Sequence, residues 1–182
     1  YTPVEAENGY GDMALTIKVA PGKTAGQGFG SNGNYMDVII KYDYATKSGY
    51  GVRIQRAGGS ATYVHLVKYV DGTGTVVASY QEENEAGEMA DAYTSVYYTE
   101  CTIKVWTVGN KLYCDVSNNS GKTVDYVDHV SLEAEIEGIS ENKAGGIYML
   151  YYSSTGDNTT YVGYFKLEWT KNPAAPVEGG EG

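Results

Sequence analysis

The sequence predicts an all-β protein built as a two-sheet antiparallel β-sandwich. Apolar and polar residues alternate with a period of two along most of the chain, as over 13–19 (MALTIKV), which indicates strands with one buried face. The chain contains 24 glycines, many of them in turn sequences between these segments. No stretch longer than a turn or two follows the helical period. Many short strands of this kind pack as two sheets or close into a barrel.

The alternation defines the elements in order, with Pro21-Gly22 ending the first strand and Ser48-Gly49 separating the second from the third. Strands are expected at about 13–19, 37–44, 50–55, 62–70, 75–80, 94–98, 101–108, 111–117, 123–137, 146–152 and 161–170. Their apolar phase predicts a core of Leu15, Val38, Ile40, Val52, Ile54, Ile103, Val105, Leu112, Val116, Leu132, Phe165, Leu167 and Trp169.

The segment 101–118 is the clearest hairpin, because Gly109-Asn110 supplies the positive φ angles that a two-residue turn needs. With Val108 opposite Lys111, one face is expected in the core and the other at the surface. The core face carries Cys101, Ile103, Val105, Leu112, Cys114 and Val116. The surface face carries Lys104, Trp106, Tyr113 and Asp115.

The same register separates the two cysteines. Cys101 and Cys114 share a face but lie about 13 Å apart along the strands. A disulfide needs Cα atoms within roughly 7 Å, so both are predicted to be unpaired, buried thiols. They therefore do not indicate a cellular compartment.

The composition narrows the possible partners. Thirteen Lys and Arg against 23 Asp and Glu leave a net charge of −10, with no basic cluster, so nucleic acids and anionic membranes are not expected as partners. No apolar run approaches the roughly 20 residues of a membrane-spanning helix, so no membrane span is predicted. Nineteen tyrosines against two Phe and two Trp predict an aromatic surface rich in hydroxyl groups.

The ends of the chain indicate its organisation. Residues 1–10 lack the pattern of a signal peptide. Residues 172–182 (NPAAPVEGGEG) hold nothing to bury and are expected to be a linker or tail. We therefore expect one β-sandwich module over 1–171, either a part of a larger chain or a mature chain whose leader was removed.

Catalysis is not predicted for the isolated chain. His65 and His129 lie in strand-like segments without a nucleophile-elbow pattern, and are expected to be sheet residues bonded to their neighbours. Glu133, Glu135 and Glu137 alternate with apolar residues, so on a strand their carboxylates would share a face about 7 Å apart.

This acidic alternation is similar to the E-I-D-I-E motif of laminarinase-type retaining glycosidases, with Glu135 in place of the central Asp. The resemblance implies a β-glucanase as one hypothesis. The alternative is an edge strand whose glutamates prevent pairing with another sheet.

Oxygen ligands in Gly-rich turns suggest a structural calcium site. Glu5, Glu7 and Asp157 offer the hard oxygen donors that calcium prefers, although no EF-hand spacing is present. The alternative is ordinary solvated acidic loops on an acidic chain. No other cofactor is expected.

Several segments together resemble a known family. They are NYMDVIIKYDYATKSGYGVRIQRA, VHLVKYVDGTGTVVAS, TECTIKVWTVGNKLYCDV, AGGIYMLYYSS and TYVGYFKLEWT. This series, over about residues 10–170, is similar to the concanavalin A-like lectin/glucanase domains in their laminin-G-like form. The resemblance implies a jelly roll of secreted or surface proteins that bind or degrade glycans. The opening VEAEN also resembles calcium-clipped carbohydrate-binding modules.

These features predict a glycan-binding accessory module of a secreted or cell-surface bacterial protein. Sugar binding needs an aromatic plate beside planar polar groups. The expected ligand-binding residues are Trp106, Tyr113, Lys104, Asp115, Arg53, Gln55, Lys41 and Asp37, with Tyr148, Tyr152 and Tyr164 extending the platform. The partner would be a polysaccharide or oligosaccharide. A competing hypothesis is a structural β-sandwich that packs against a neighbouring module of the same chain.

Overall fold

The computed structural model describes residues 8–22, 29, 31–58, 61–80, 82–83, 89–90, 94, 96–97, 99–118, 127–154 and 160–171. Its strands are β1 (Tyr10–Pro21), β2 (Tyr35–Asp43), β3 (Ser48–Gly58), β4 (Ala61–Val70), β5 (Thr73–Ser79), β6 (Glu82–Glu83), β7 (Met89–Ala90), β8 (Cys101–Val108), β9 (Lys111–Asn118), β10 (His129–Glu135), β11 (Gly146–Tyr152) and β12 (Thr160–Lys171). Within these ranges, no helix is long and apolar enough to span a membrane.

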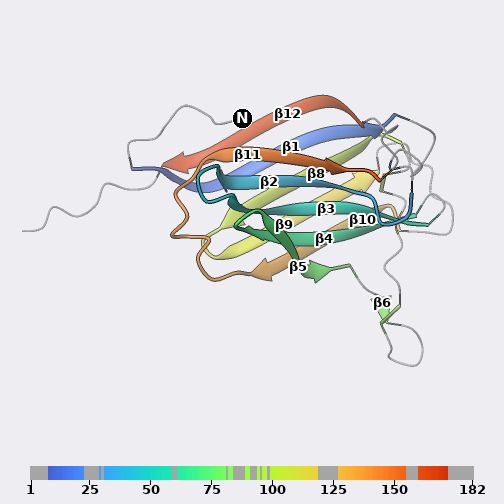
Figure 1. Ribbon diagram of the computed structural model, residues 1–182, viewed down its shortest axis with the longest axis horizontal. Helices are drawn as coiled ribbons and strands as arrows, with labels where there is room; N and C mark the ends of the chain where they lie inside the picture. Colours follow the sequence, from blue (N-terminus) through green and yellow to red (C-terminus); the bar gives the residue numbers. More distant parts are fainter. Residues whose placement is uncertain are drawn as a thin grey trace, which may run out of the picture.

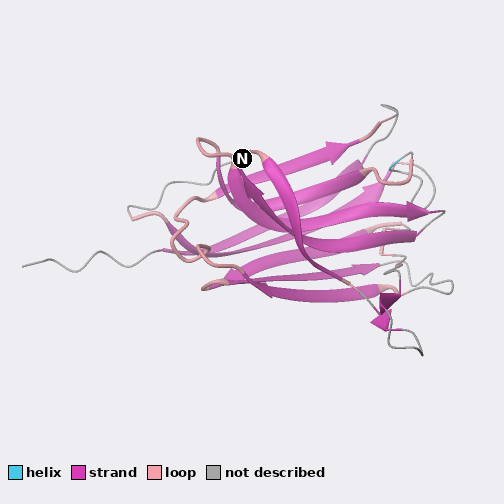
Figure 2. Cartoon of the chain, turned by 60° about the horizontal axis from the view of Figure 1, so that its bottom comes forward, coloured by secondary structure: helices cyan, strands magenta, loops and turns pink. Residues whose placement is uncertain are grey.

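Ten of the strands form two antiparallel sheets of five. Sheet A has the order β10-β9-β8-β1-β12, and sheet B has the order β11-β2-β3-β4-β5. Figure 1 shows sheet B lying over sheet A, with β11 and β12 along one side of the sandwich and β5 and β10 along the other. Figure 2 shows the same two layers from another side, with loops gathered at the strand ends. The all-β sandwich expected from the alternation is confirmed.

The core lies between the inner faces of the two sheets. Of the residues predicted to form it, those fully buried are Leu15, Val38, Ile40, Val52, Ile54, Ile103, Val105, Leu112 and Val116. Leu132 and Leu167 are partly buried and pack against this cluster. The period-two pattern therefore identified the inner faces of the central strands correctly.

Two predicted core residues are exposed instead. Phe165 is 43% exposed and Trp169 is 41% exposed, although their cross-strand partners Ile17 and Met13 on β1 are buried. The physical reason is position in the sheet. β12 is an edge strand of sheet A, so only part of its inner face is covered by the core, at Leu167. The alternation reports which face a side chain takes, and strand order decides whether anything covers it.

The hairpin register is confirmed residue by residue. β8 and β9 pair with Val108 opposite Lys111, Trp106 opposite Tyr113 and Cys101 opposite Asn118. Cys101 and Cys114 are buried and unpaired, as predicted. Burial raises the pKa of the Cys114 thiol to about 12, and burial also raises the pKa of the Cys101 thiol.

Three expected elements differ from the structure or lie beyond it. The strand predicted at 94–98 is wrong: Thr94 forms isolated bridges to Thr62 and Val127, while residues 96–97 lie in a turn. The strand predicted to run to residue 137 ends at Glu135. The expected tail at 172–182 lies outside the described residues.

Candidate functional site

The outer face of sheet B carries a cavity of about 760 Å³, which we call the tyrosine cavity. It is lined by Tyr35, Tyr42, Tyr44, Lys47, Arg53, Tyr69, Asp71, Gly72, Thr73, Gly74, Tyr148 and Leu150. These residues come from all five strands of sheet B and from the β2–β3 and β4–β5 turns. The volume is within the range of small-ligand sites in proteins.

A β-bulge in β2 brings Tyr42 to this face. The register between β2 and β3 shifts between Ile40 and Asp43, and Lys41 has a φ of 50°. Simple alternation would place Tyr42 beside Ile40 in the core. The extra residue of the bulge reverses the phase, so that Tyr42 packs with Ile39, Tyr69 and their neighbours on the outer face.

The same bulge removes Lys41 from the surface. Its Nζ donates to the carbonyl oxygens of Tyr10 at 3.2 Å and Gly11 at 2.6 Å, and the residue is 1% exposed. Burial lowers the pKa of Lys41 to about 8, although the negative charge of Asp12 acts to raise it. The expectation that Lys41 stands beside Asp37 as an exposed polar group is therefore wrong. Lys41 ties β2 to β1 at the sandwich end.

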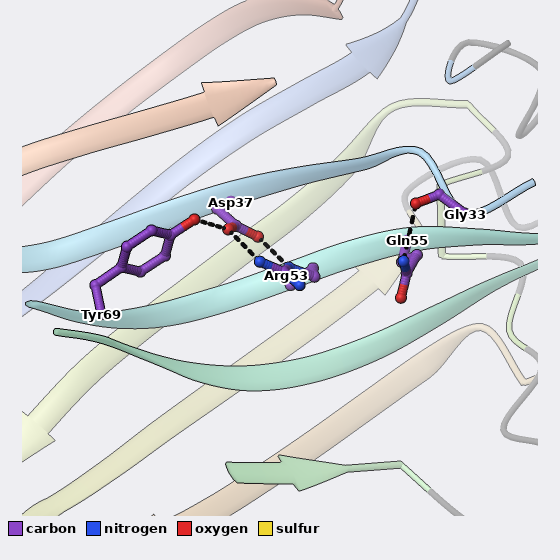
Figure 3. A network of polar contacts seen from close by, with 5 residues as sticks. All are labelled: Gly33, Asp37, Arg53, Gln55 and Tyr69. Carbon is purple, nitrogen blue, oxygen red and sulfur yellow. Dashed lines mark hydrogen bonds and ion pairs between the residues drawn. The ribbon is translucent and has the colours of Figure 1, made fainter. Parts of the chain in front are cut away.

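An ion pair lies at the centre of the outer face. Arg53 on β3 faces Asp37 on β2, with Nε 2.7 Å from Oδ1 and Nη2 2.9 Å from Oδ2 (Figure 3). The Asp37 side chain is fully buried and that of Arg53 is 11% exposed. Burial disfavours the Arg53 cation, but the hydrogen bonds and charge of Asp37 outweigh it and raise the pKa of Arg53.

Two tyrosines complete this network. The hydroxyl of Tyr69 donates to Asp37 Oδ2, and the guanidinium carbon of Arg53 lies 3.8 Å from the centre of the Tyr35 ring. Burial and Asp37 together raise the pKa of Tyr69. The guanidinium is therefore held by a salt bridge on one side and by an aromatic face on the other, which fixes its orientation in the cavity wall.

The remaining rings form a connected aromatic wall. Tyr42 and Tyr148 stack with centroids 4.5 Å apart, and Tyr44 meets Tyr42 edge to face at 4.9 Å. Tyr69 meets Tyr148 edge to face at 6.3 Å. Tyr44 is 48% exposed, so this wall offers ring surface to solvent at its outer end.

Gln55 and His65 lie on the same face, beyond the cavity lining. Gln55 Nε2 donates to the Gly33 carbonyl at 2.8 Å, so its side-chain amide is already hydrogen-bonded to the segment that precedes β2 (Figure 3). His65 stands opposite Arg53, and its Nδ1 lies 2.6 Å from the Ser79 hydroxyl. This is the hydrogen-bonded sheet histidine that the sequence predicted.

The other half of the predicted site lies on the opposite face of the molecule. Trp106 and Tyr113 stack at 5.2 Å on the outer face of sheet A, and the Lys104 ammonium lies 4.8 Å from the Trp106 ring centre. Asp115 accepts a hydrogen bond from the Ser131 hydroxyl, and its Oδ1 also contacts Nε2 of His129. The structure therefore divides the expected residues into two groups separated by the thickness of the sandwich. Within the sheet A group, the Trp106 ring is already contacted by the Tyr113 ring and by the Lys104 ammonium.

Only two of the three glutamates of the expected acidic motif lie on β10 and share its outer face. Glu133 and Glu135 are exposed on β10, an edge strand of sheet A, opposite Tyr113 and Lys111. Glu137 lies in the turn that follows, so it does not continue the alternation. This arrangement corresponds to the edge-strand alternative.

The proposed calcium ligands Glu5, Glu7 and Asp157 lie outside the described residues, so the structure does not test that prediction. Tyr152 lies on sheet B and stacks on Tyr35 at 5.2 Å, whereas Tyr164 lies on sheet A.

Most of the cavity wall was not predicted from the sequence. Tyr42, Tyr44 and Tyr69 were not among the expected ligand-binding residues, nor were Lys47 and Asp71. Tyr69 could have been found, because it shares the outer phase of β4 with His65. Tyr42 could not, because the bulge that places it on the outer face has no signal in the alternation.

No protein-family model matches the sequence, and no curated protein matches it at a significant level. Solved structures do match it. Arcelin-5, a lectin-like defence protein from Phaseolus vulgaris, matches with a TM-score of 0.51 at 9% identity, over 91% of this chain and 74% of that one.

The CBM2 module of the evolved Dit protein of Lactobacillus casei BL23 phage J-1 matches with a TM-score of 0.50 at 8% identity. The match covers 87% of this chain and only 60% of that one. The enzymatically active domain of bacteriophage CBA120 tailspike protein 2 matches with a TM-score of 0.51 at 6% identity, over 91% of this chain and 23% of that one. At these identities the likeness is one of fold. The chain has a jelly-roll β-sandwich fold similar to that of these proteins, which is the fold that the resemblance in its sequence implied.

Proposed function

We propose that this chain is a non-catalytic carbohydrate-binding module that holds its ligand in the tyrosine cavity of sheet B. A sugar ring presents an apolar C–H face and a rim of hydroxyls, so its site needs aromatic surface beside fixed hydrogen-bonding groups. The tyrosine cavity combines both. The observation that carries the proposal is the Arg53 guanidinium, fixed by Asp37 and Tyr35 within a wall of tyrosine rings.

The fold supports this proposal. The similar solved structures include a lectin-like defence protein and a CBM2 module. The sheet A group gives weaker support, because Trp106 already stacks on Tyr113 beneath Lys104. We therefore assign the ligand to sheet B. A secreted or cell-surface role beside a glycan-degrading or glycan-capturing module remains part of the proposal.

The test is affinity electrophoresis of the chain through gels that contain individual polysaccharides. The wild-type chain should be retarded by at least one of them. Tyr148→Ala removes a ring from the cavity wall and should abolish the retardation, whereas Trp106→Ala on the opposite face is the matched control and should keep it. Retardation lost in Trp106→Ala and retained in Tyr148→Ala would move the site to sheet A.

The positions of the two tryptophans provide a fluorescence control for which sheet binds the ligand. Both tryptophans of the chain, Trp106 and Trp169, lie on strands of sheet A. A sugar bound on sheet B should therefore leave tryptophan fluorescence unchanged while it alters tyrosine absorbance. A ligand-induced change in tryptophan emission would indicate contact with the other sheet.

One observation favours a second role, packing against a neighbouring module. Val162 is 51% exposed, Phe165 43% and Trp169 41%, on the edge strand β12. Clustered exposed apolar side chains mark interaction surfaces. Hydrogen exchange of the β12 amides, compared between this chain and the full gene product, tests this role. Equal exchange in both would exclude it.

A further inference from the structure

We infer that the tyrosine cavity selects uncharged saccharides and rejects acidic ones. This inference rests on the proposed function, and it names the chemical class of the ligand. It follows from the charges of the cavity lining and from the partners that those charges already have.

The strongest cation in the wall is already neutralised. Asp37 accepts from Arg53 through both carboxylate oxygens, at 2.7 and 2.9 Å, and the carboxylate is inaccessible to solvent. To a ligand, Arg53 and Asp37 together therefore present a strong local dipole and no net charge. An approaching carboxylate would have to compete with Asp37 for the guanidinium at a site that Asp37 already satisfies.

The rest of the lining is balanced as well. Lys47 and Asp71 are exposed in adjacent turns, where the Gly72 amide donates to the Lys47 carbonyl at 2.9 Å. Their charges oppose each other. Burial raises the pKa values of Tyr42 and Tyr44, and burial with Asp37 raises that of Tyr69, so these phenols stay uncharged at neutral pH. The wall and its buried carboxylate therefore carry no net charge.

The surroundings add to this preference. The chain has a net charge of −10, so its long-range field repels polyanions. A carboxylate that enters the cavity loses hydration without gaining an unpaired cation in the wall, because Lys47 is exposed and pairs at exposed positions contribute little.

Uncharged hydroxyls meet no such penalty. A guanidinium has five N–H groups, and Arg53 donates two of them to Asp37. The N–H groups of Arg53 that Asp37 does not hold can donate to sugar hydroxyls. The hydroxyls of Tyr44 and Tyr69 already donate to the Ile147 carbonyl and to Asp37, so their oxygens can accept from the sugar. Because Asp37 holds the fork in place, little side-chain entropy is lost when the ligand binds.

The experiment is isothermal calorimetry of the wild-type chain with neutral gluco- and galacto-oligosaccharides and with uronate oligosaccharides of the same length, at low and high salt. A neutral ligand should bind with a Kd that changes by less than about twofold between about 20 and 200 mM NaCl, because no net charge is brought together. Uronates should bind at least about tenfold more weakly at low salt, where repulsion is least screened.

Asp37→Asn removes the compensating charge and should shift the affinity ratio toward uronates. Glu133→Gln, which removes one negative charge at an exposed position on sheet A, is the matched control and should leave that ratio within about twofold. If Asp37→Asn does not fold, the wild-type chain provides the test by itself: its affinity for uronates should rise between low and high salt, because added salt screens the repulsion.

Tighter binding of uronates than of neutral sugars, weakened by added salt, would overturn the inference and leave the proposed function standing. The absence of binding to every saccharide would instead overturn the proposed function itself.

Discussion

Arg53 and Asp37 face each other across the β2–β3 ladder, and the guanidinium holds both oxygens of a carboxylate that solvent does not reach. A surface sheet does not need such a pair for stability, because two apolar side chains would fill the same positions without the cost of removing charge from water. The pair instead keeps a rigid donor fork in the cavity wall. Its contribution to binding should therefore be separable from its contribution to stability.

The first prediction separates the contribution of the Arg53–Asp37 pair to binding from its contribution to stability. Arg53→Met leaves Asp37 buried without its cation and should lower the free energy of unfolding by about 3–5 kcal/mol. The double variant Asp37→Leu/Arg53→Met should recover most of that loss, because the buried charge is gone. Neither variant should bind glycan. Urea denaturation and calorimetry measure the two effects, and glycan binding by the double variant would contradict the assigned role of Arg53.

The second prediction concerns Gly74, where β5 passes beside the cavity. A Cβ at this position would lie 2.9 Å from Cζ of Tyr69 and 3.1 Å from Nη2 of Arg53. Tyr69 is buried and hydrogen-bonded to Asp37, which also holds Arg53, so Gly74→Ala should displace the two groups that shape the wall at a cost in stability. We expect a clear loss of affinity together with a lower urea midpoint. Gly163→Ala, on β12 with nothing within 4 Å, is the matched control and should change neither quantity. Equal affinities for both variants and wild type would show that the ligand does not use this part of the wall.

How far the sequence predicts the structure depends on the element. The β8–β9 hairpin was predicted to the residue, because Gly109-Asn110 determines the turn and the turn determines every opposed pair. The inner faces of the central strands followed in the same way from the apolar alternation.

The failures come from tertiary context. Phe165 and Trp169 have the core phase, but strand order places β12 at an open edge. The bulge in β2 buries Lys41 and turns Tyr42 to the outer face of sheet B. Lys41 has a positive φ although it is not a glycine, so the sequence gives no sign of the bulge. For the candidate site, the alternation identified Arg53 and Asp37 as neighbours on two strands. It could not show that Trp106 and Tyr113 lie on the far side of the sandwich, because strand order is not encoded locally.

The third prediction is a pH dependence of stability through His65. Burial, and then the charge of Arg53, lower the pKa of His65 below its usual 6.5, with Asp37 opposing. His65 therefore takes up a proton at a higher pH in the unfolded chain than in the folded chain. The free energy of unfolding consequently decreases as the pH falls through 6.5.

Urea midpoints measured from about pH 7 to about pH 5 should fall for the wild-type chain, and fall less for His65→Gln, which has no titrating ring. The difference between the two curves isolates His65 from the carboxylates. Superimposable pH profiles would show that His65 is not responsible.

The fourth prediction concerns the two thiols. Thiol reagents attack the thiolate, and burial raises the pKa values of Cys101 and Cys114, the latter to about 12. A colorimetric disulfide reagent at about pH 8 should therefore leave both unmodified in the native protein, because thiolate is scarce and access is blocked. Both should react in denaturant. Rapid reaction of either thiol under native conditions would mean that the β8–β9 face opens readily.

The most direct test of the account is the amide NMR spectrum of the chain with and without a saturating neutral oligosaccharide that binds it. Binding in the tyrosine cavity predicts that the largest shifts fall on the outer-face residues of sheet B around Tyr42, Arg53 and Tyr148, while Trp106 and Tyr113 stay unchanged. If the largest chemical-shift changes instead fall on Trp106 and Tyr113, and the amides of sheet B do not shift, the assignment of the ligand to sheet B is wrong.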